Sequence, residues 1–247
     1  MSRYSGVWGK VRWVFDLAAM ERVEIELYGD ANARAMYLDV TQRHRRLKLR
    51  IGSLGPSLVR LTGWDGGYLK GGAFADARRK ARRAEKVGYS VRPIRAGEHR
   101  TAILEIHRST PMRQGEPMKP ETQSEEAVAR FLGDRRGNGV FDREGRLRGY
   151  MLWIEAGEAV MLRGLMGHAD SLRDGIMYLL FAETIRQSIE AAENGSGARW
   201  LQYTFHHRQG DGMRQFKQEL GFRPYLVTWR WRERAASERS PAGAAPA

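Results

Sequence analysis

Three side chains that can exchange protons with a substrate lie close together near the C-terminal end of the chain: Tyr203, His206 and His207. A histidine side chain changes its protonation near neutral pH, so His206 or His207 could act as a general base. The Tyr203 hydroxyl could supply a proton to a leaving group. Because neighbouring residues of a strand point to opposite faces of the sheet, we expect at most one of these histidines to be catalytic.

Positive charge is concentrated in two segments. Residues 43–50 carry five basic side chains and no acidic one, and residues 78–95 carry eight basic side chains and Glu85. Such segments attract polyanions: a nucleic acid, a nucleotide-linked substrate or an acidic membrane surface. A solvated basic surface is the alternative. The candidate polyanion-binding residues are Arg43, Arg45, Arg46, Lys48, Arg50, Arg78, Arg79, Lys80, Arg82, Arg83 and Lys86.

The composition narrows the class of protein. The chain has 247 residues, of which 42% are hydrophobic and 29% charged, so it is long enough to bury a core and is not disordered. The absence of cysteine excludes a disulfide scaffold, a thiolate zinc site and a cysteine nucleophile. We find neither a transmembrane run, a signal peptide nor metal-ligand spacing, and we therefore expect a cytoplasmic protein without a metal.

The first 88 residues are expected to be rich in strands and to end in a basic helix. Alternating apolar and polar residues predict strands at 23–27 and 47–51, and residues 35–40 are expected to form another short strand. Asp76 is expected to cap a helix that runs to Val87, and Gly88 ends it.

Residues 89–232 are predicted to follow the order β-α-α-β-β-β-α-β-α-β. Thr122 and Glu125 have the spacing of a capping box, and the longest helix is expected at about residues 174–192. The last residues, 235–247, are rich in Ala, Pro and Ser and are expected to be disordered. We therefore divide the chain into segments 1–88, 89–234 and 235–247.

This order of elements resembles the GNAT superfamily of N-acetyltransferases. Residues 216–224 (FKQELGFRP) are similar to the F-K-x-x-x-G-F ending of that superfamily. The resemblance covers residues 89–232. It implies an α/β (α+β) fold, a mixed sheet flanked by helices, with a reduced strand-rich N-terminal part. It also places the reaction near Tyr203, where neighbouring strands separate and hold the acyl group.

A second resemblance concerns residues 78–89 (RRKARRAEKVGY). They are similar to the R-x-x-x-R-x-A-x-x-x-G helix of Fem-type transferases, which move an amino acid from aminoacyl-tRNA onto an amine. In that family the helix ends the first of two GNAT-like halves, and related acyl-CoA enzymes share it. The resemblance implies that Lys217 stabilises negative charge on the tRNA 3′ end or on the tetrahedral intermediate. Since only 88 residues precede Tyr89, the first half would be reduced.

The resemblance also implies a donor-binding loop before the longest helix. In GNAT enzymes an Arg/Gln-x-x-Gly-x-Gly/Ala loop holds the coenzyme A pyrophosphate on amides at a helix N-terminus. Here Leu172 and Met177 take the basic and the last small position, and Asp170 and Asp174 would repel a pyrophosphate. This poor match favours aminoacyl-tRNA as donor. The candidate donor-binding residues are Ser171, Arg173 and Gly175.

The loop at residues 108–118 is a candidate acceptor site, because the corresponding loop usually lines the acceptor pocket in enzymes of this fold. Arg113 and Gln114 could bind a carboxylate or phosphate of the acceptor. An ordinary loop rich in Pro and Gly is the alternative.

Our leading hypothesis is an acyltransferase that passes an acyl or aminoacyl group to a primary amine by direct attack, with aminoacyl-tRNA narrowly favoured. An acetyl-CoA-dependent N-acetyltransferase is the alternative, and a non-catalytic RNA-binding protein on a GNAT scaffold is the second. A tRNA donor requires residues 43–50 and 78–86 on one face with the cleft. Acetyl-CoA requires free amides in residues 168–177, and a binding-only protein requires a closed cleft. The acceptor amine stays open: a peptide, a cell-wall precursor or a small molecule.

Overall fold

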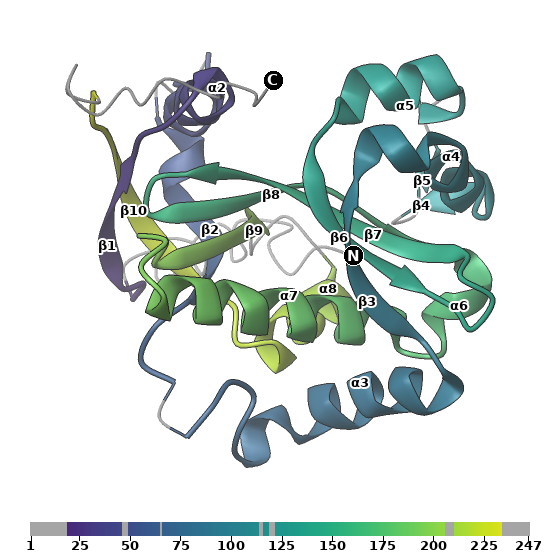
Figure 1. The fold of residues 1–247 in the computed structure, drawn as a ribbon. Coiled ribbons are helices and arrows are strands. Elements are labelled where there is room, and N and C mark those ends of the chain that lie inside the picture. The colour runs from purple at the N-terminus through teal and green to yellow at the C-terminus, as the bar shows by residue number, and fades with distance from the viewer. Residues whose placement is uncertain are drawn as a thin grey trace, which may run out of the picture.

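The computed structural model describes residues 19–45, 49–64, 66–113, 116–118, 122–205 and 210–233. In this part of the chain an eight-stranded mixed sheet has the order β1-β10-β2-β9-β8-β7-β6-β3 (Figure 1). Its strands are β1 (Arg22–Leu27), β2 (Leu54–Arg60), β3 (Ser90–Arg95), β6 (Arg136–Phe141), β7 (Leu147–Ala156), β8 (Ala159–Gly167), β9 (Trp200–Phe205) and β10 (Arg223–Trp231). A separate pair is formed by β4 (Met112–Arg113) and β5 (Glu116–Pro117).

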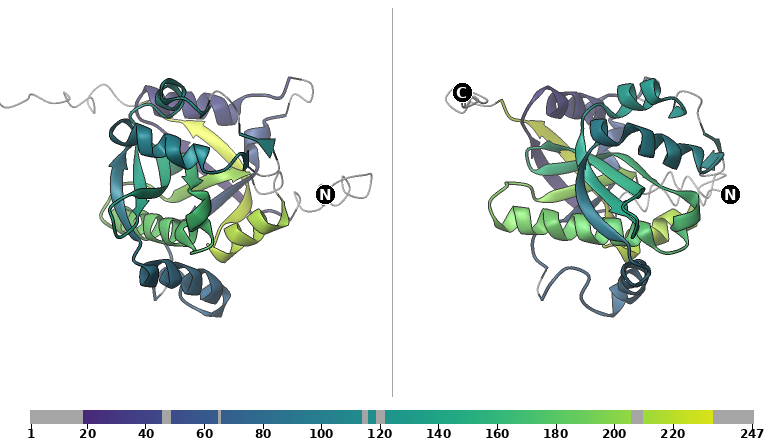
Figure 2. Two further views of the ribbon diagram at one scale, coloured as in Figure 1. Left: turned by 90° about the vertical axis from the view of Figure 1, so that its right-hand side faces the viewer. Right: turned by 45° about the vertical axis from the view of Figure 1, so that its right-hand side comes forward.

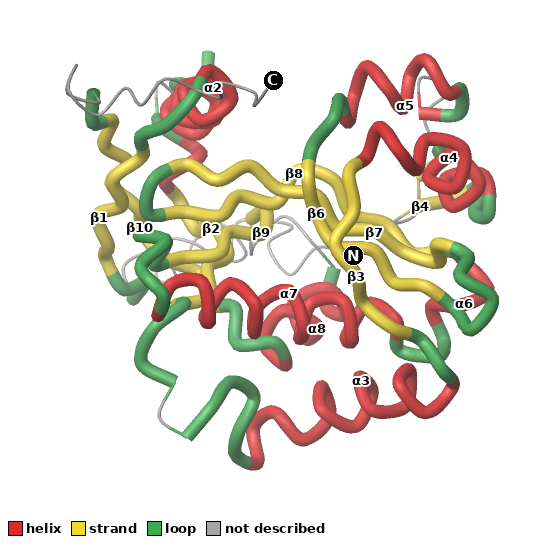
Figure 3. The backbone as a smooth tube through the Cα atoms, viewed as in Figure 1, coloured by secondary structure: helices red, strands yellow, loops and turns green. Residues whose placement is uncertain are grey.

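Helices cover both faces of the sheet (Figures 2 and 3). One face carries α2 (Ala31–Thr41), α4 (Arg100–Arg108) and α5 (Glu125–Leu132); the other carries α7 (Ile176–Glu193) and α8 (Asp211–Glu219). The basic helix α3 (Ala75–Val87) packs on α7 rather than on the sheet. Short helical turns are η1 (Ile51–Ser53), η2 (Gly72–Phe74), η3 (Ala96–His99) and α6 (Ala169–Leu172).

Both faces of the central strands are apolar because both are covered. On β7, Met151 packs into the core beneath α7, whereas its neighbours Tyr150 and Leu152 pack with α4 and α5. Successive side chains of a strand point to opposite faces, so this strand is apolar nearly throughout rather than alternating.

The predicted fold class is confirmed. The main elements from β3 to β10 follow the order that the sequence predicts for residues 89–232, to which the structure adds the short strands β4 and β5 and the short helix α6. The strands of the N-terminal segment belong to the same sheet: β2 lies between β9 and β10 and is antiparallel to both, and β1 pairs in parallel with β10. The boundary between segments 1–88 and 89–234 therefore does not separate two sheets. The tail 235–247 lies outside the described residues.

Two strand predictions in the N-terminal segment are wrong. Residues 35–40 lie within α2, because Asp30 caps that helix through Ala33 N at 2.9 Å, and its buried residues recur at helical spacing (Ala33, Met36 and Val40). Residue 51 begins the turn η1 instead of ending a strand, and residues 46–48 lie outside the described residues. Conversely, the sequence does not predict the strand β2. It contains Gly55 and Pro56, and both residue types normally indicate turns.

Two predicted helix starts are also wrong. The N-cap of α3 is Phe74, and Asp76 lies in the first turn of the helix, where its charge complements the helix dipole. The N-cap of α5 is Ser124, whose hydroxyl accepts a hydrogen bond from Ala127 N at 3.1 Å. Thr122 is therefore not the capping residue. The predicted end of α3 at Gly88 is confirmed, since Gly88 takes the left-handed conformation.

Small residues let α3 lie close to α7. The helix presents Ala77, Ala81 and Ala84 to the interior and exposes its cations. At the start of α7, Gly175 has a φ of +89°, and a Cβ there would lie 2.5 Å from the carbonyl oxygen of Lys80. The basic helix is thus seated directly against the loop that precedes α7.

We expect Gly175→Ala to lower the free energy of unfolding by roughly 2 kcal/mol or more, because an alanine disfavours this φ and would push the Lys80 carbonyl away. Gly195→Ala is the matched control: its φ is +87°, with no atom within 4 Å of an added Cβ. The control should lower the free energy of unfolding by only about 1 kcal/mol. Urea unfolding measures both, and equal losses would contradict the close approach of α3.

Candidate functional site

The candidate active site lies where two parallel strands separate. β8 and β9 pair from Ala159 with Trp200 to Met161 with Gln202, but β8 continues to Gly167 and β9 to Phe205. The far halves of the two strands form no ladder in the described structure, so a gap opens between them. This is the place where the sequence resemblance expects the reaction.

Lys217 of α8 extends its amino group to this end of β9. The side chain is fully buried, with 0% of its surface exposed. Its Nζ lies 2.9 Å from Thr204 Oγ1, 2.9 Å from the carbonyl oxygen of Phe205 and 3.2 Å from Ser57 Oγ. It also lies 4.6 Å from the centre of the Tyr203 ring. One amino group therefore joins α8, β9 and the N-terminal strand β2.

The helical spacing of α8 explains why a lysine is buried there. Arg214 and Lys217 are three residues apart and lie on the buried side of α8, followed by the core residue Leu220. The chain then turns at Gly221, whose φ is +80°, and enters β10. Lys217 thus occupies a position that is usually apolar.

Burial lowers the pKa of Lys217 to about 7. Removing an ammonium group from water disfavours its charged form, and the oxygens within hydrogen-bond distance of Nζ are those of hydroxyl and carbonyl groups. Near neutral pH the amine is present in both forms. The neutral form can accept a proton from Thr204 while it donates to Ser57 and to the Phe205 carbonyl. These are the properties of a general acid–base group.

Thr204 connects Lys217 with the opposite side of the sheet. Its φ is +46°, and Leu69 is the other non-glycine residue with a positive φ in the described part of the chain. Such conformations cost free energy and often occur at functional sites. Thr204 contacts Lys217 through Oγ1 and also lines a cleft on the side of the sheet that α2 covers.

This cleft, which we name the reaction cleft, has a volume of about 400 Å³. It lies between the C-terminal end of α2, the turn η1 and the separating strands β8 and β9. Its polar lining includes Asp39, Arg43, His44, Arg163, Gln202 and Thr204. An acceptor could thus approach Thr204 from one side of the sheet while Lys217 lies on the other.

Of the three predicted catalytic residues at the end of β9, the structure describes Tyr203. Tyr203 is only 6% exposed, its ring contacts Phe181, and its hydroxyl lies 3.8 Å from Met213 Sδ. It therefore belongs to the core on the α7 and α8 side, next to Lys217. The predicted bases His206 and His207 lie outside the described residues, and so does Gln114. Of Arg113 only the backbone is described, in β4.

The predicted donor loop is held closed by its own backbone. The amides of Ser171, Asp174 and Gly175 donate to carbonyl groups three residues earlier, at distances of 3.0 to 3.1 Å. The amide of Ala169 donates to Ser109 Oγ at 2.9 Å. The amides of Ala169, Ser171, Asp174 and Gly175 are thus already engaged. Arg173 lies at the C-cap of α6, and Gly175 lies under α3.

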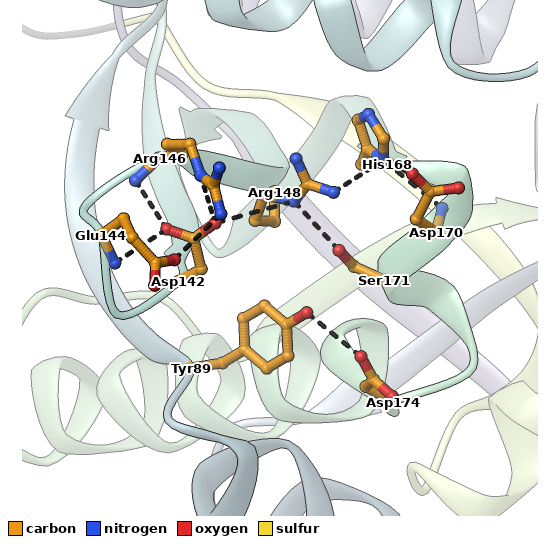
Figure 4. A network of polar contacts seen from close by, with 9 residues as sticks. All are labelled: Tyr89, Asp142, Glu144, Arg146, Arg148, His168, Asp170, Ser171 and Asp174. Carbon is orange, nitrogen blue, oxygen red and sulfur yellow. Dashed lines mark hydrogen bonds and ion pairs between the residues drawn. The ribbon is translucent and has the colours of Figure 1, made fainter.

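Side chains fasten the same loop to the rest of the domain (Figure 4). Arg148 of β7 donates to Ser171 Oγ and to His168 Nδ1, both at 3.0 Å. Burial and the charge of Arg148 lower the pKa of His168, which favours the neutral ring that accepts this bond. On the other side of the loop, Tyr89 donates to Asp174 at 3.1 Å. Ser171 therefore has a structural partner in this state.

The basic side chains of α3 fall into two groups. Lys80 is turned inwards, 2.8 Å from Glu219 Oε2 and 2.9 Å from the Tyr178 hydroxyl, and so joins α3 to α7 and α8. Arg78 donates to the carbonyl groups of Leu69 and Gly71. The outward group consists of Arg79, Arg82, Arg83 and Lys86, which we name the α3 basic face.

The two basic segments do not share one face with the cleft. Arg43 lines the reaction cleft on the α2 side of the sheet, whereas α3 packs on α7 on the other side. Arg45 and Arg50 are exposed near Arg43, and Arg46 and Lys48 lie outside the described residues. The described residues therefore do not form a single polyanion-binding surface that spans both segments.

The sequence did not indicate several residues of this site. Thr204 carried a weak signal, as a polar residue in an apolar strand, but Ser57 follows Gly55 and Pro56 and carried none. Asp39 and Arg163 come from elements with no recognisable motif. In the part of the chain that the structure describes, no group of three or more His, Asp or Glu side chains could hold a metal ion. No helix of that part could span a membrane.

No family model matches this chain, and no curated protein matches its sequence. Solved structures do resemble it. A conserved protein of unknown function from Bacteroides thetaiotaomicron has a TM-score of 0.50 and 13% identity, with 79% of this chain and 67% of that chain covered. The C-terminal domain of a putative lysylphosphatidylglycerol synthetase from Agrobacterium fabrum has a TM-score of 0.44 and 15% identity, with 69% and 58% covered.

A tandem GNAT protein from the clavulanic acid biosynthesis pathway has a TM-score of 0.42 and 13% identity, with 88% of this chain and 66% of that chain covered. The chain thus spans less than two thirds of the length of some of these proteins. At such identities the similarity concerns the fold alone. The mixed sheet flanked by helices is the architecture that the sequence resemblance implied.

Proposed function

We propose that this protein is an acyltransferase that moves an acyl or aminoacyl group to a primary amine by direct attack. The observation that carries the proposal is the buried amino group of Lys217. It has a pKa of about 7, and Thr204 connects it to an open cleft where β8 and β9 separate. The open cleft argues against a protein that only binds RNA.

Proton transfer through Thr204 would activate the acceptor. The amine enters as an ammonium ion and must lose a proton before its nitrogen can attack. The Thr204 hydroxyl accepts that proton while passing its own to the neutral Nζ of Lys217. The nitrogen lone pair then forms the new bond to the donor carbonyl carbon, and the bond from that carbon to the leaving oxygen breaks.

Lys217 has a second role once it is protonated. Its ammonium group, 2.9 Å from Thr204 Oγ1, then stabilises the negative charge of the tetrahedral intermediate through the Thr204 hydroxyl. The proton returns through Thr204 to the leaving oxygen, so that Lys217 is neutral again. The attacking nitrogen loses its second proton to solvent as the amide forms, and atoms and charge then balance. This sequence joins the charge-stabilising role that the resemblance implies with the acid–base role that burial of the amine supports.

The donor we favour is aminoacyl-tRNA. The loop that would hold a coenzyme A pyrophosphate uses the amides of Ala169, Ser171, Asp174 and Gly175 internally, which argues against the standard mode of coenzyme A binding. The α3 basic face lies on the α7 side of the sheet, beside the start of α7, and could bind tRNA phosphates. We therefore assign tRNA contacts to α3, and assign Arg43, which lines the reaction cleft, to the acceptor side. Acyl-CoA is the alternative donor.

We expect the contribution of Lys217 to stability to depend on pH. Because folding lowers its pKa from 10.5 to about 7, the unfolded chain binds more protons than the folded chain between these pH values. The free energy of unfolding should therefore rise with pH relative to Lys217→Met, by up to about 1.4 kcal/mol per pH unit. Urea unfolding at pH 7, 8 and 9 measures this difference. Lys86→Met, which removes an exposed lysine, is the control, and a pH-independent difference for Lys217→Met would refute the lowered pKa.

Binding of tRNA and of acetyl-CoA, compared over a salt series, tests the donor. We expect tRNA to bind with micromolar or lower Kd and to weaken steeply with salt. The double variant Arg82→Glu/Arg83→Glu should weaken tRNA binding at least tenfold, because neither side chain has an ion pair or hydrogen bond in the described structure. Arg22→Glu/Arg223→Glu is matched in charge and alters exposed residues of β1 and β10.

The outcomes separate the two donors. Loss of tRNA binding in the α3 variant alone supports aminoacyl-tRNA, and charged tRNA then becomes the substrate for transfer assays, in which Lys217→Met should bind tRNA normally but transfer nothing. Binding of acetyl-CoA without tRNA would instead identify an N-acetyltransferase with an unusual donor loop. Binding of tRNA with no transfer to any primary amine would favour the RNA-binding alternative.

A further inference from the structure

A second cleft, of about 610 Å³, lies beside the reaction cleft. We name it the α2–α5 groove, because those two helices form its walls on one side of the sheet (Figure 1). Met36 and Arg163 line both hollows, so one ligand can extend from the groove into the reaction cleft. The other lining residues come from α2, α5, the strand β7 and the segments before and after α5, which contribute Thr122 and Arg135.

The groove carries positive charge that the described residues do not neutralise. Its charged lining residues are Arg130, Arg135 and Arg163. Arg135 donates to the carbonyl groups of Phe131 and Leu132 at 2.7 Å, and burial and the charge of Arg163 lower its pKa. Arg130 is exposed and forms no hydrogen bond or ion pair in the described structure. Only Arg163 contacts a carboxylate, that of Asp39 at 2.7 Å.

Apolar side chains lie beside these arginines. Phe131 is 57% exposed, although a phenylalanine gains free energy when water is removed from it. Met36 and Ile154 also line the groove, with Ala35 and Ala127. Anion-binding groups next to an apolar surface complement a molecule that has an anionic group on an apolar body.

The opposite end of this path carries a carboxylate beside its cations. Asp39 lines the reaction cleft and not the groove, and Thr204 with Lys217 lies beyond it. Asp39 is paired with Arg163, which lines both hollows, and Arg43 lines the same cleft. A ligand whose anionic group contacts the arginines of the groove can therefore place an ammonium group on Asp39 in the position of Arg163.

We propose that the α2–α5 groove binds an amphiphilic organic anion, and that this molecule is the amine acceptor. Its phosphate or carboxylate contacts Arg130 and Arg135, its apolar body covers Phe131 and Ile154, and its amino group reaches Asp39 and Thr204. The assignment as acceptor rests on the proposed acyltransferase function, whereas the binding of an amphiphilic anion does not.

Calorimetry with dodecyl phosphate, kept below its micelle concentration, tests the groove. We expect it to bind, and inorganic phosphate and dodecyltrimethylammonium to bind at least tenfold more weakly, since each offers only one of the two features. Arg130→Gln should weaken dodecyl phosphate binding about tenfold, as expected for one lost charged hydrogen bond. Phe131→Ser should weaken binding of dodecyl phosphate but not of inorganic phosphate. Arg22→Gln is the matched control.

Two binding results would overturn the groove assignment. One is that the cationic and anionic detergents bind with equal affinity. The other is that the Arg130→Gln variant binds dodecyl phosphate with the affinity of the native protein. Arg130 is exposed, so this variant is expected to fold. Arg135→Gln provides a second test, accompanied by circular dichroism because it removes a helix-capping contact.

A transfer assay separates this proposal from the proposed function. We expect 12-aminododecyl phosphate to be a better acceptor than dodecylamine, with a KM that rises about tenfold in Arg130→Gln while kcat changes little. If dodecyl phosphate binds through Arg130 but 12-aminododecyl phosphate accepts no acyl group from any donor, the acceptor assignment fails and the anion groove stands. If 12-aminododecyl phosphate is acylated with the same KM by the native protein and by Arg130→Gln, the transferase stands and the groove assignment fails.

Discussion

The pairing of β2 with both β9 and β10 is the contact on which the rest of the structure depends. It inserts a strand from the N-terminal segment into the middle of a sheet whose other central strands come from residues after 89. Without β2, the backbone of β9 would lack its partner on that side, next to the gap that faces β8. The same strand brings Ser57 to within 3.2 Å of Lys217. The N-terminal segment therefore completes both the sheet and the candidate site.

A buried amine is costly for the fold and useful for chemistry for the same reason. Removal from water disfavours the ammonium form of Lys217, which lowers its pKa to about 7 and makes it able to accept and release protons near neutral pH. The hydroxyl groups of Ser57 and Thr204 can act as donors or acceptors, so both forms of the amine keep their hydrogen bonds. The positive φ of Thr204 is consistent with a site in which local strain holds a side chain in place.

Basic side chains form different surfaces on the two sides of the sheet. On one side, the α3 basic face lies beside the start of α7, with Lys80 directed inwards to Glu219 and Tyr178 as a structural contact. On the other side, Arg43, Arg130, Arg135 and Arg163 line two adjoining hollows. The sheet separates these surfaces, so two different anionic partners, a donor and an acceptor, fit the arrangement better than one polyanion that covers everything.

The sequence by itself determined the main elements from residue 89 onwards, because periodic apolar residues and local turns specify them, and it made Lys217 a candidate site residue through a short motif. The sequence analysis did not predict α2 or β2. Residues 35–40 were interpreted as a strand, although Ala33, Met36 and Val40 recur at helical spacing, and Gly55 and Pro56 resemble a turn. Only the tertiary structure decided that Ser57 meets Lys217, 160 residues away, and that the two basic segments lie on opposite sides of the sheet. Burial and long-range pairing are properties of the packed chain, and so the pKa of Lys217 could not be read from its neighbours in sequence.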